Sequence, residues 1–202
     1  MTFTQALMPA AIACALFAGS AMAVELEPVA AYSDNTVTFL GQVTDQTCQI
    51  TINGQAVKPV VLLPTVPVES FDADRARAGD TEFVVAVSGC PINDPPPTRA
   101  LVNGKRISTT FVAHETIDGN LLNVIPEASG GAKNVHINII DTRNYDIDFA
   151  TPFHGEGDLR LKGGDSTTAT ATYTAQYIAH GEPSELGAGY VRASMQYALS
   201  YD

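Results

Sequence analysis

An all-β fold, built as one sandwich, is the class that this sequence predicts, and three observations support it. Apolar and polar residues alternate with a period of two over short stretches, which is typical of strands with one buried face. Turn residues interrupt these stretches about every eight to twelve positions, as in antiparallel sandwiches. The 202 residues include 16 Gly, 12 Pro and no Trp, and beyond residue 23 no helical pattern lasts the roughly ten residues that a helix needs.

The predicted strands follow one another along the chain from residue 36. Asn53–Gly54 stands directly after the second of them and predicts a tight hairpin turn. The last stretch is the clearest, because its odd positions are apolar from Val191 to Tyr201 and only Ala198 interrupts the polar positions between them. The stretches with strand character are residues 36–44, 49–52, 57–63, 83–87, 108–113, 120–125, 135–140, 167–178 and 191–201.

The charge balance excludes two classes of partner. Hydrophobic residues make up 45% of the chain and charged residues 16%, so a buried core is expected. Eleven Lys and Arg stand against 22 Asp and Glu, for a net charge of −11, and no basic cluster interrupts this balance. Binding to nucleic acid or to an acidic membrane surface requires clustered cations, so neither is predicted.

The amino-terminal segment predicts a secretory signal peptide. Residues 6–18 are almost entirely apolar, a run shorter than the roughly 20 residues of a membrane-spanning helix. Ala21 and Ala23 match the small-x-small pattern of a cleavage site, which places cleavage after Ala23. The leader, residues 1–5, lacks the usual Lys or Arg.

This predicted cleavage accounts for the odd number of cysteines, because it removes one of them. The chain has three cysteines, and Cys14 lies within the signal peptide. The mature chain then keeps an even pair, Cys48 and Cys90, which in an exported protein predicts a disulfide bond. Two buried free thiols are the alternative, and an oxidising compartment disfavours it.

Several segments together resemble the subunits of chaperone–usher fimbriae. Residues 34–43, with an alternating pattern around Gly41, resemble the amino-terminal extension of those pilins. Residues 83–91 resemble the strand that carries the second cysteine, and residues 135–141 resemble a strand that ends in Asp before a turn. The terminal pattern is the most specific, with Tyr201 as the penultimate aromatic residue and Gly189 preceding it in the final segment.

The resemblance implies an incomplete immunoglobulin-like sandwich that lacks its last strand and is completed by a donor strand. It divides the chain into a signal peptide (residues 1–23), an extension that contains the donor strand and leads into the first core strand (24–47), and a pilin domain (48–202). The implied donor residues are Val37, Phe39, Gly41 and Val43, although the same stretch is also an ordinary first strand by its pattern. The implied acceptor-groove strand, which the chaperone also contacts, comprises Gly189, Val191, Ala193, Met195, Tyr197, Leu199, Tyr201 and Asp202.

The function implied by this resemblance is that of a structural fimbrial subunit, which polymerises by donor-strand exchange into a surface fibre used in adhesion. The implied partners are identical or related pilin subunits, a periplasmic chaperone and an outer-membrane usher. The implied route leads through the periplasm to the bacterial cell surface. A minor tip or adapter subunit that binds a host receptor, or a subunit that ends the fibre, is the alternative.

Neither an enzyme nor a metal or cofactor site is predicted. The four histidines, at positions 114, 136, 154 and 180, show no spacing typical of a zinc site. The carboxylate pairs Asp72/Asp74 and Asp146/Asp148 suggest a glycosidase at most weakly, because solvated turn charge explains them better. Motifs for nucleophilic serine, phosphate or dinucleotide binding are missing from the sequence.

Overall fold

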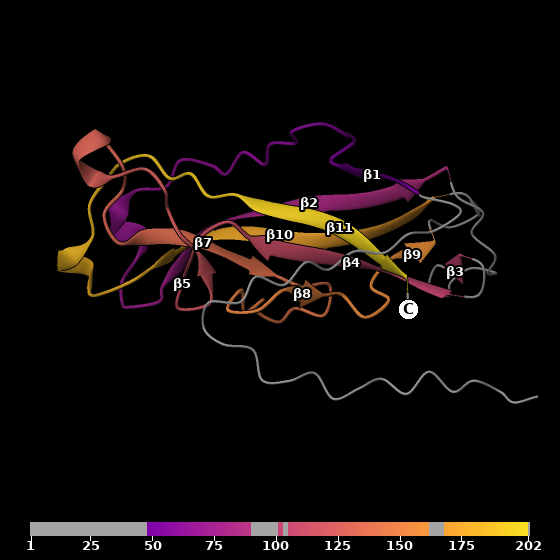
Figure 1. Ribbon diagram of the computed structural model, residues 1–202. Coiled ribbons are helices and arrows are strands. Elements are labelled where there is room, and N and C mark those ends of the chain that lie inside the picture. The colour runs from indigo at the N-terminus through magenta and orange to yellow at the C-terminus, as the bar shows by residue number, and fades with distance from the viewer. Residues whose placement is uncertain (1–47, 90–100, 103–104, 162–167, 202) are drawn as a thin grey trace, which may run out of the picture. The chain divides into compact units, whose positions relative to one another are not determined.

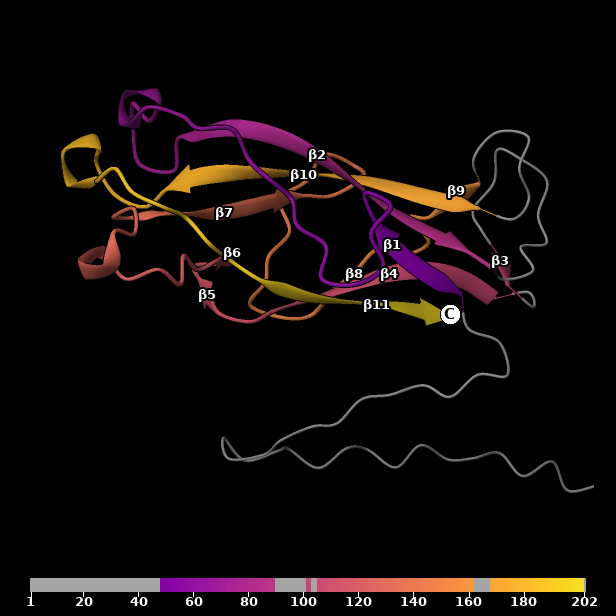
Figure 2. The same cartoon turned by 90° about the horizontal axis from the view of Figure 1, so that it is seen from above.

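The computed structural model describes residues 48–89, 101–102, 105–161 and 168–201, with the backbone alone at 101, 102 and 105. The chain divides into two units, Met1–Gly41 and Gln42–Asp202, and every described residue belongs to the second. In this unit, antiparallel strands form two layers, which Figure 2 shows from above. The all-β class predicted from the sequence is confirmed, whereas the domain boundaries at residues 23 and 47 stay predictions.

The larger sheet has the strand order β1-β2-β10-β7-β6-β5, and β9 also pairs with β10. Its centre is formed by the long strands β2 and β10, which pair over most of their length apart from a bulge between Ala175 and Tyr177. The strands are β1 (Gln49–Ile52), β2 (Arg77–Ser88), β5 (Thr116–Ile117), β6 (Asn120–Leu121), β7 (Val135–Ile140), β9 (Arg160–Leu161) and β10 (Ala169–Ala179).

The smaller sheet has the order β11-β4-β3, and β8 also pairs with β4. Its strands are β3 (Leu101–Val102), β4 (Lys105–Ala113), β8 (Phe153–His154) and β11 (Met195–Tyr201). The register of β11 against β4 runs without a break from Met195 opposite Ala113 to Tyr201 opposite Ile107. Three short 3-10 helices, η1 (Val68–Ser70), η2 (Glu127–Ser129) and η3 (Pro183–Glu185), gather at the end of the sandwich away from the carboxyl terminus (Figure 1).

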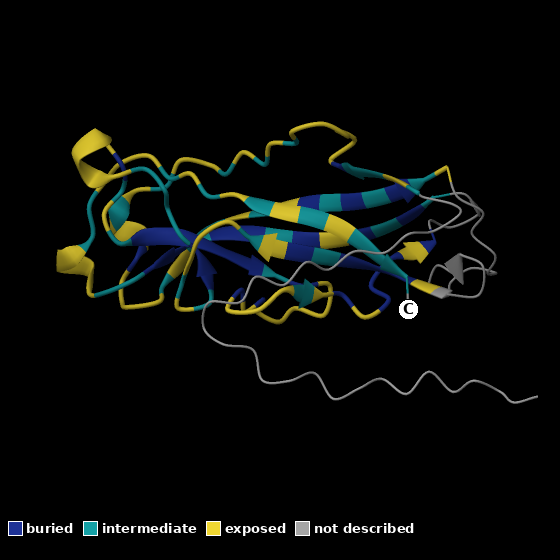
Figure 3. Ribbon diagram, viewed as in Figure 1, coloured by how far each residue is buried: buried dark blue, intermediate teal, exposed yellow. Residues whose placement is uncertain are grey.

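The core lies between the sheets and is centred on an aromatic cluster. The rings of Phe83 and Tyr173 stack with centroids 5.6 Å apart, and Phe111 meets Tyr173 edge-on at 5.0 Å. All three are buried, as are the neighbouring positions Val85 and Val87 on β2. Burial in Figure 3 follows these inner strands, whereas along β11 half-buried and exposed residues alternate. The final strand therefore covers the core only partly.

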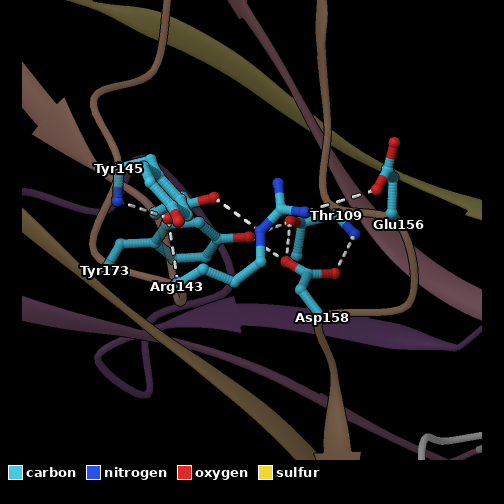
Figure 4. A network of polar contacts seen from close by, with 7 residues as sticks. Thr109, Arg143, Tyr145, Glu156, Asp158 and Tyr173 are labelled. Carbon is cyan, nitrogen blue, oxygen red and sulfur yellow. Dashed lines mark hydrogen bonds and ion pairs between the residues drawn. The ribbon is translucent and has the colours of Figure 1, made fainter.

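A buried polar network joins the two sheets inside this core (Figure 4). The carboxylate of Asp158 accepts hydrogen bonds from the Thr109 N–H at 3.0 Å and from the hydroxyls of Thr109 and Tyr173. Burial, and then the negative charge of Asp158, raise the pKa of Tyr173 well above its usual range. The phenol therefore stays a hydrogen-bond donor, which the buried carboxylate requires.

Asp141 directly follows β7, in agreement with the prediction from residues 135–141 of a strand that leads into an Asp before a turn. Its carboxylate accepts hydrogen bonds from the N–H groups of Arg143 and Tyr145, both at 2.8 Å, and from the Arg143 Nε at 3.1 Å. These bonds close the turn that follows the strand. Arg143 also reaches Glu156 at 3.4 Å, on the loop that leads to Asp158.

Most predicted strands are present, although several have other bounds than predicted. The stretch 83–87 lies within the longer β2, 108–113 lies within the longer β4, and 167–178 corresponds to β10 at 169–179. Residues 49–52 and 135–140 are strands with the predicted bounds, and Asn53–Gly54 forms the expected turn, with φ of 48° and 79° and a bridge between Ile52 and Gln55. The strand predicted at 120–125 ends at Leu121, and the last strand begins at Met195 instead of residue 191.

Residues 57–63 alternate in exposure but do not pair, so the strand predicted there is wrong. The side chains of Val61 and Leu63 are half-buried, whereas Val60 and Leu62 are 62% and 82% exposed. An extended chain becomes a strand only when a neighbour completes its hydrogen bonds. Within the described residues, no backbone hydrogen bond joins residues 57–66 to another part of the chain.

Candidate functional site

An apolar groove runs between the unpaired segment 57–66 and the final segment of the chain. Two adjoining cavities, of about 660 and about 590 Å³, form it, and both are lined by Leu63, Tyr177 and Val191. The floor of the larger cavity consists of core side chains from the large sheet, namely Phe83, Leu121, Ile137, Ile139 and Ala175. The groove thus exposes part of the hydrophobic core.

One wall of the groove consists of the final segment, whose odd residues are half-buried, and the even residues Arg192 and Ser194 also line the larger cavity. Val191, Ala193, Met195 and Tyr197 line the larger cavity, and Gly189 and Val191 line the smaller one. Each odd position from 191 to 201 is half-buried, whereas Arg192, Ser194, Gln196 and Ala198 are exposed. The structure therefore brings most of the predicted acceptor residues to one groove.

The backbone of this wall also faces the groove's open edge. The Ser194 carbonyl accepts the His114 N–H at 3.1 Å, which makes Ser194 and His114 a hydrogen-bonded pair of the β11–β4 ladder. Such pairs alternate along an antiparallel ladder, so the N–H and C=O groups of Met195, Tyr197 and Leu199 point away from β4. On that side, β11 has no strand partner among the described residues.

The edge of β11 and segment 57–66 therefore offer two unpaired backbones on either side of an apolar floor. An open strand edge is a template for pairing with another extended chain. Near this edge, the Tyr197 hydroxyl donates a hydrogen bond at 3.3 Å to the carbonyl of Ala56, the residue just before segment 57–66. The groove has the shape and chemistry to accept a strand with alternating apolar side chains.

Gly189 is a position where the fold requires a glycine. A Cβ added there would lie 2.4 Å from both the Gly131 carbonyl carbon and the Ala132 nitrogen. This close approach allows Tyr190 to bond on both sides, by donating its N–H to the Gly130 carbonyl at 2.9 Å and accepting the Ala132 N–H at 2.9 Å. The glycine noted in the terminal pattern thus lets the final segment lie against the loop after η2.

Some of the remaining predicted site residues are described by the structure, and others lie outside its described residues. Leu199 and Tyr201 pack against the core beyond the groove lining, and the Tyr201 hydroxyl accepts the Cys48 N–H at 3.2 Å. Cys48 is disulfide-bonded, whereas Cys90 lies outside the described residues, so their pairing stays a prediction. The donor residues Val37, Phe39, Gly41 and Val43 and the terminal Asp202 also lie outside the described residues.

Asn123 is a groove-supporting residue that sequence reasoning missed. Its side-chain oxygen accepts the Arg192 N–H at 3.0 Å and the Ile125 N–H at 3.1 Å, and its amide nitrogen donates to the Tyr190 and Ala132 carbonyls at 3.1 and 3.2 Å. Its own N–H donates to the His136 Nδ1 at 3.2 Å. The only sequence signal was an Asn within a predicted strand, where Asn is uncommon.

His136 is a buried histidine behind this asparagine. Burial, followed by the nearby His180, lowers the pKa of His136 to about 4, and Asp118 opposes this shift. The two imidazole rings meet edge-on at 5.5 Å, and the His180 Nε2 lies 2.9 Å from an Asp118 oxygen. A neutral His136 has an unprotonated Nδ1 that can accept the Asn123 N–H.

The carboxylate pairs have structural partners instead of a shared site. Asp146 forms an ion pair with Arg77 at 2.5 Å, and Asp148 accepts the Ala150 N–H at 2.9 Å. Asp74 accepts the Gly181 N–H at 2.7 Å. No cluster of three potential metal ligands occurs among the described residues. In the same part of the chain, no helix has the length and apolar character that crossing a bilayer requires.

The fold and the groove define an all-β domain whose core is incompletely covered. Comparison with known proteins shows what the chain is similar to. No family model matches the chain. The chain is 27% identical over 168 residues to an F17 fimbrial protein of Escherichia coli, covering 83% of this chain and 87% of that one. It is 29% identical over 189 residues to Long polar fimbria protein A of Salmonella typhimurium, covering 93% and 96%.

A third relative is the Major fimbrial subunit SMF-1 of Stenotrophomonas maltophilia, with 27% identity and coverage of 87% and 97%. The solved P pilus rod subunit PapA has the same fold, with a TM-score of 0.53 at 12% identity, over 76% of this chain and 99% of that one. These comparisons confirm the resemblance to fimbrial pilins that the sequence predicts. The relatives are structural fimbrial subunits.

Proposed function

We propose that this protein is a structural subunit of a chaperone–usher fimbria and polymerises by donor-strand exchange into a surface fibre used in adhesion. Residues 37–43 of one subunit enter the groove between segment 57–66 and β11 of the next. The observation that supports this most is the wall of odd residues, whose side chains line an apolar groove while their backbone groups face an open edge. A β-strand inserted from a neighbouring subunit fills the apolar groove with its side chains and pairs its backbone with the open edge of β11.

The donor stretch has the composition that such a groove requires. Val37, Phe39 and Val43 share one face of an extended chain, and Gly41 lies in phase with them. Burial of each large side chain contributes on the order of 1.5–3 kcal/mol. A glycine in phase fits where the donor backbone approaches the groove floor closely.

The same groove explains why the subunit needs a protecting partner before assembly. An exposed core and an open edge are an aggregation hazard. In this proposal, a periplasmic chaperone covers the groove, an outer-membrane usher receives the complex, and the fibre ends at the cell surface. Asp202 and the end of β11 contribute to capture by the chaperone.

The proposal is tested by a charge placed on the donor face. Gly41→Arg introduces a long cationic side chain into the apolar groove of the neighbour, so we expect subunits that fold with the chaperone but form no fibres. Thr38→Arg is the matched control, because residue 38 alternates with the donor face and its side chain points away from the groove. Fibres are counted by negative-stain microscopy of cells that express each variant. Normal fibres from Gly41→Arg refute the donor assignment.

A deletion tests the acceptor side. Removing residues 196–202 takes away most of β11 and its pairing with β4, so we expect no complex with the chaperone in a pull-down from the periplasm. The internal control is the Gly41→Arg variant, whose groove is intact and which the chaperone should still retain. A stable, soluble subunit that lacks residues 196–202 contradicts the acceptor role.

A further inference from the structure

We propose that Asn123 is a positioning residue of the groove, which holds residues 190–192 against the body of the domain and thereby determines how firmly a donor strand is retained. This inference rests on the proposed function, because it concerns the grip of the same groove. It adds residues outside the predicted donor and acceptor sets.

The contacts of Asn123 join three segments at the junction of the two cavities. Its amide nitrogen and oxygen hold the Tyr190 carbonyl and the Arg192 N–H, and Val191 between them lines both cavities. A backbone hydrogen bond from the Val124 N–H to the Arg192 carbonyl, at 2.8 Å, holds the same segment at the next residue. The position of Val191 in the groove therefore depends on the residue that fixes its two neighbours.

This support is needed because the final segment is not yet a strand at this point. Regular pairing with β4 begins at Met195, so residues 190–192 rely on side-chain and loop contacts to continue the groove wall. Asn123 is half-buried there, and both its side-chain nitrogen and its side-chain oxygen form hydrogen bonds to this segment. Replacing it by Ala leaves the Tyr190 carbonyl and the Arg192 N–H without those partners.

His136 connects this support to pH. Its Nδ1 accepts the Asn123 N–H, and a protonated imidazole carries a hydrogen on both nitrogens, so protonation places two donors face to face. The titratable groups that face His136 from the surrounding elements are His180, which follows β10, and Asp118, in the turn between β5 and β6. On β10, its register partner is the apolar Ile178. Acid therefore displaces Asn123 and loosens residues 190–192.

The test uses the full chain loaded with a fluorescent peptide of residues 36–44, Thr-Val-Thr-Phe-Leu-Gly-Gln-Val-Thr, with both ends blocked. This peptide contains no titratable side chain, so its own charge is constant. Its dissociation is followed after addition of excess unlabelled peptide at pH 7. For Asn123→Ala we expect dissociation about five- to tenfold faster, the scale of one or two lost hydrogen bonds, and faster amide exchange at Arg192.

The matched control is Asn120→Ala, which removes a buried amide three residues away. Among the described residues, this amide bonds Asn138 and the Asp118 carbonyl and forms no hydrogen bond with residues 190–192. Equal dissociation rates for Asn123→Ala and Asn120→Ala overturn the positioning role. A wild-type chain that fails to bind the peptide counts instead against the proposed function.

The pH profile provides an independent measurement. For the wild-type chain we expect faster peptide dissociation as pH falls through about 4, where the imidazole of the folded chain takes up its proton. For His136→Asn, whose amide oxygen can accept the same N–H without titrating, we expect a flat profile. If Asn123→Ala does not fold, this comparison decides alone. If the dissociation rate of His136→Asn depends on pH as strongly as that of the wild-type chain, the proposed coupling is overturned.

Discussion

The buried imidazole of His136 should make the stability of the subunit depend on pH, and His136→Asn is the variant that isolates this effect. The ring is 7% exposed and accepts a hydrogen bond in its neutral form. Its pKa is about 4 in the folded chain and 6.5 when exposed in the unfolded chain. Between these two values the unfolded state binds more protons, so acid favours unfolding.

The size and sign of the effect follow from these two pKa values. The contribution of His136 is fully present above pH 6.5, declines as pH falls towards 4 and is lost below it. The difference in pKa corresponds to about 3 kcal/mol over that window.

The assay is urea unfolding at intervals between pH 7.5 and pH 3.5 for both proteins, with the disulfide intact. We expect the difference in free energy of unfolding between wild type and His136→Asn to change by about 3 kcal/mol across the series, in favour of the variant in acid. The comparison cancels the titration of the shared groups that do not interact with His136. A difference that stays constant with pH refutes the reasoning, because the imidazole would then titrate alike in both states.

Three further predictions concern single contacts. Gly189→Ala places a methyl group 2.4 Å from backbone atoms, so we expect a loss of about 1–3 kcal/mol in urea unfolding, and no loss would contradict this packing. Tyr173→Phe removes a donor to a buried carboxylate and should cost about 1–3 kcal/mol, whereas Tyr177→Phe, a half-buried tyrosine without such a bond in the described residues, should cost little; equal costs for the two would contradict the role of the network. Non-reducing peptide mapping should recover Cys48 linked to Cys90, and a different linkage, or none, would contradict the pairing.

The strands that sequence reasoning predicted well are those whose alternation coincides with a paired neighbour. Residues 49–52 and 135–140 have the predicted bounds because local pattern and tertiary pairing agree there. Residues 57–63 were predicted from an apolar run that ends at Pro64, and they lack a paired neighbour. A local sequence pattern cannot reveal whether a partner strand is present. The failed prediction thus falls on the wall of the groove.

The candidate site divides in the same way. The odd residues from Val191 to Tyr197 could be predicted, because a two-residue period places them on one face. Asn123 could not, since its importance depends on four partners brought together by loops of different lengths. The low pKa of His136 likewise arises from burial by segments distant in the sequence, which no local pattern encodes.

The open edge of β11 determines how the risk of aggregation changes with fibre length. In a head-to-tail array of the proposed kind, each subunit carries one donor and one acceptor, and the interface does not close into a ring. Each added subunit covers one acceptor groove and brings one of its own. A fibre of any length then exposes a single uncovered edge or none, whereas the same subunits in free solution expose one edge each. Polymerisation is therefore also the means by which the chain removes its own aggregation-prone surface, and growth adds no further risk.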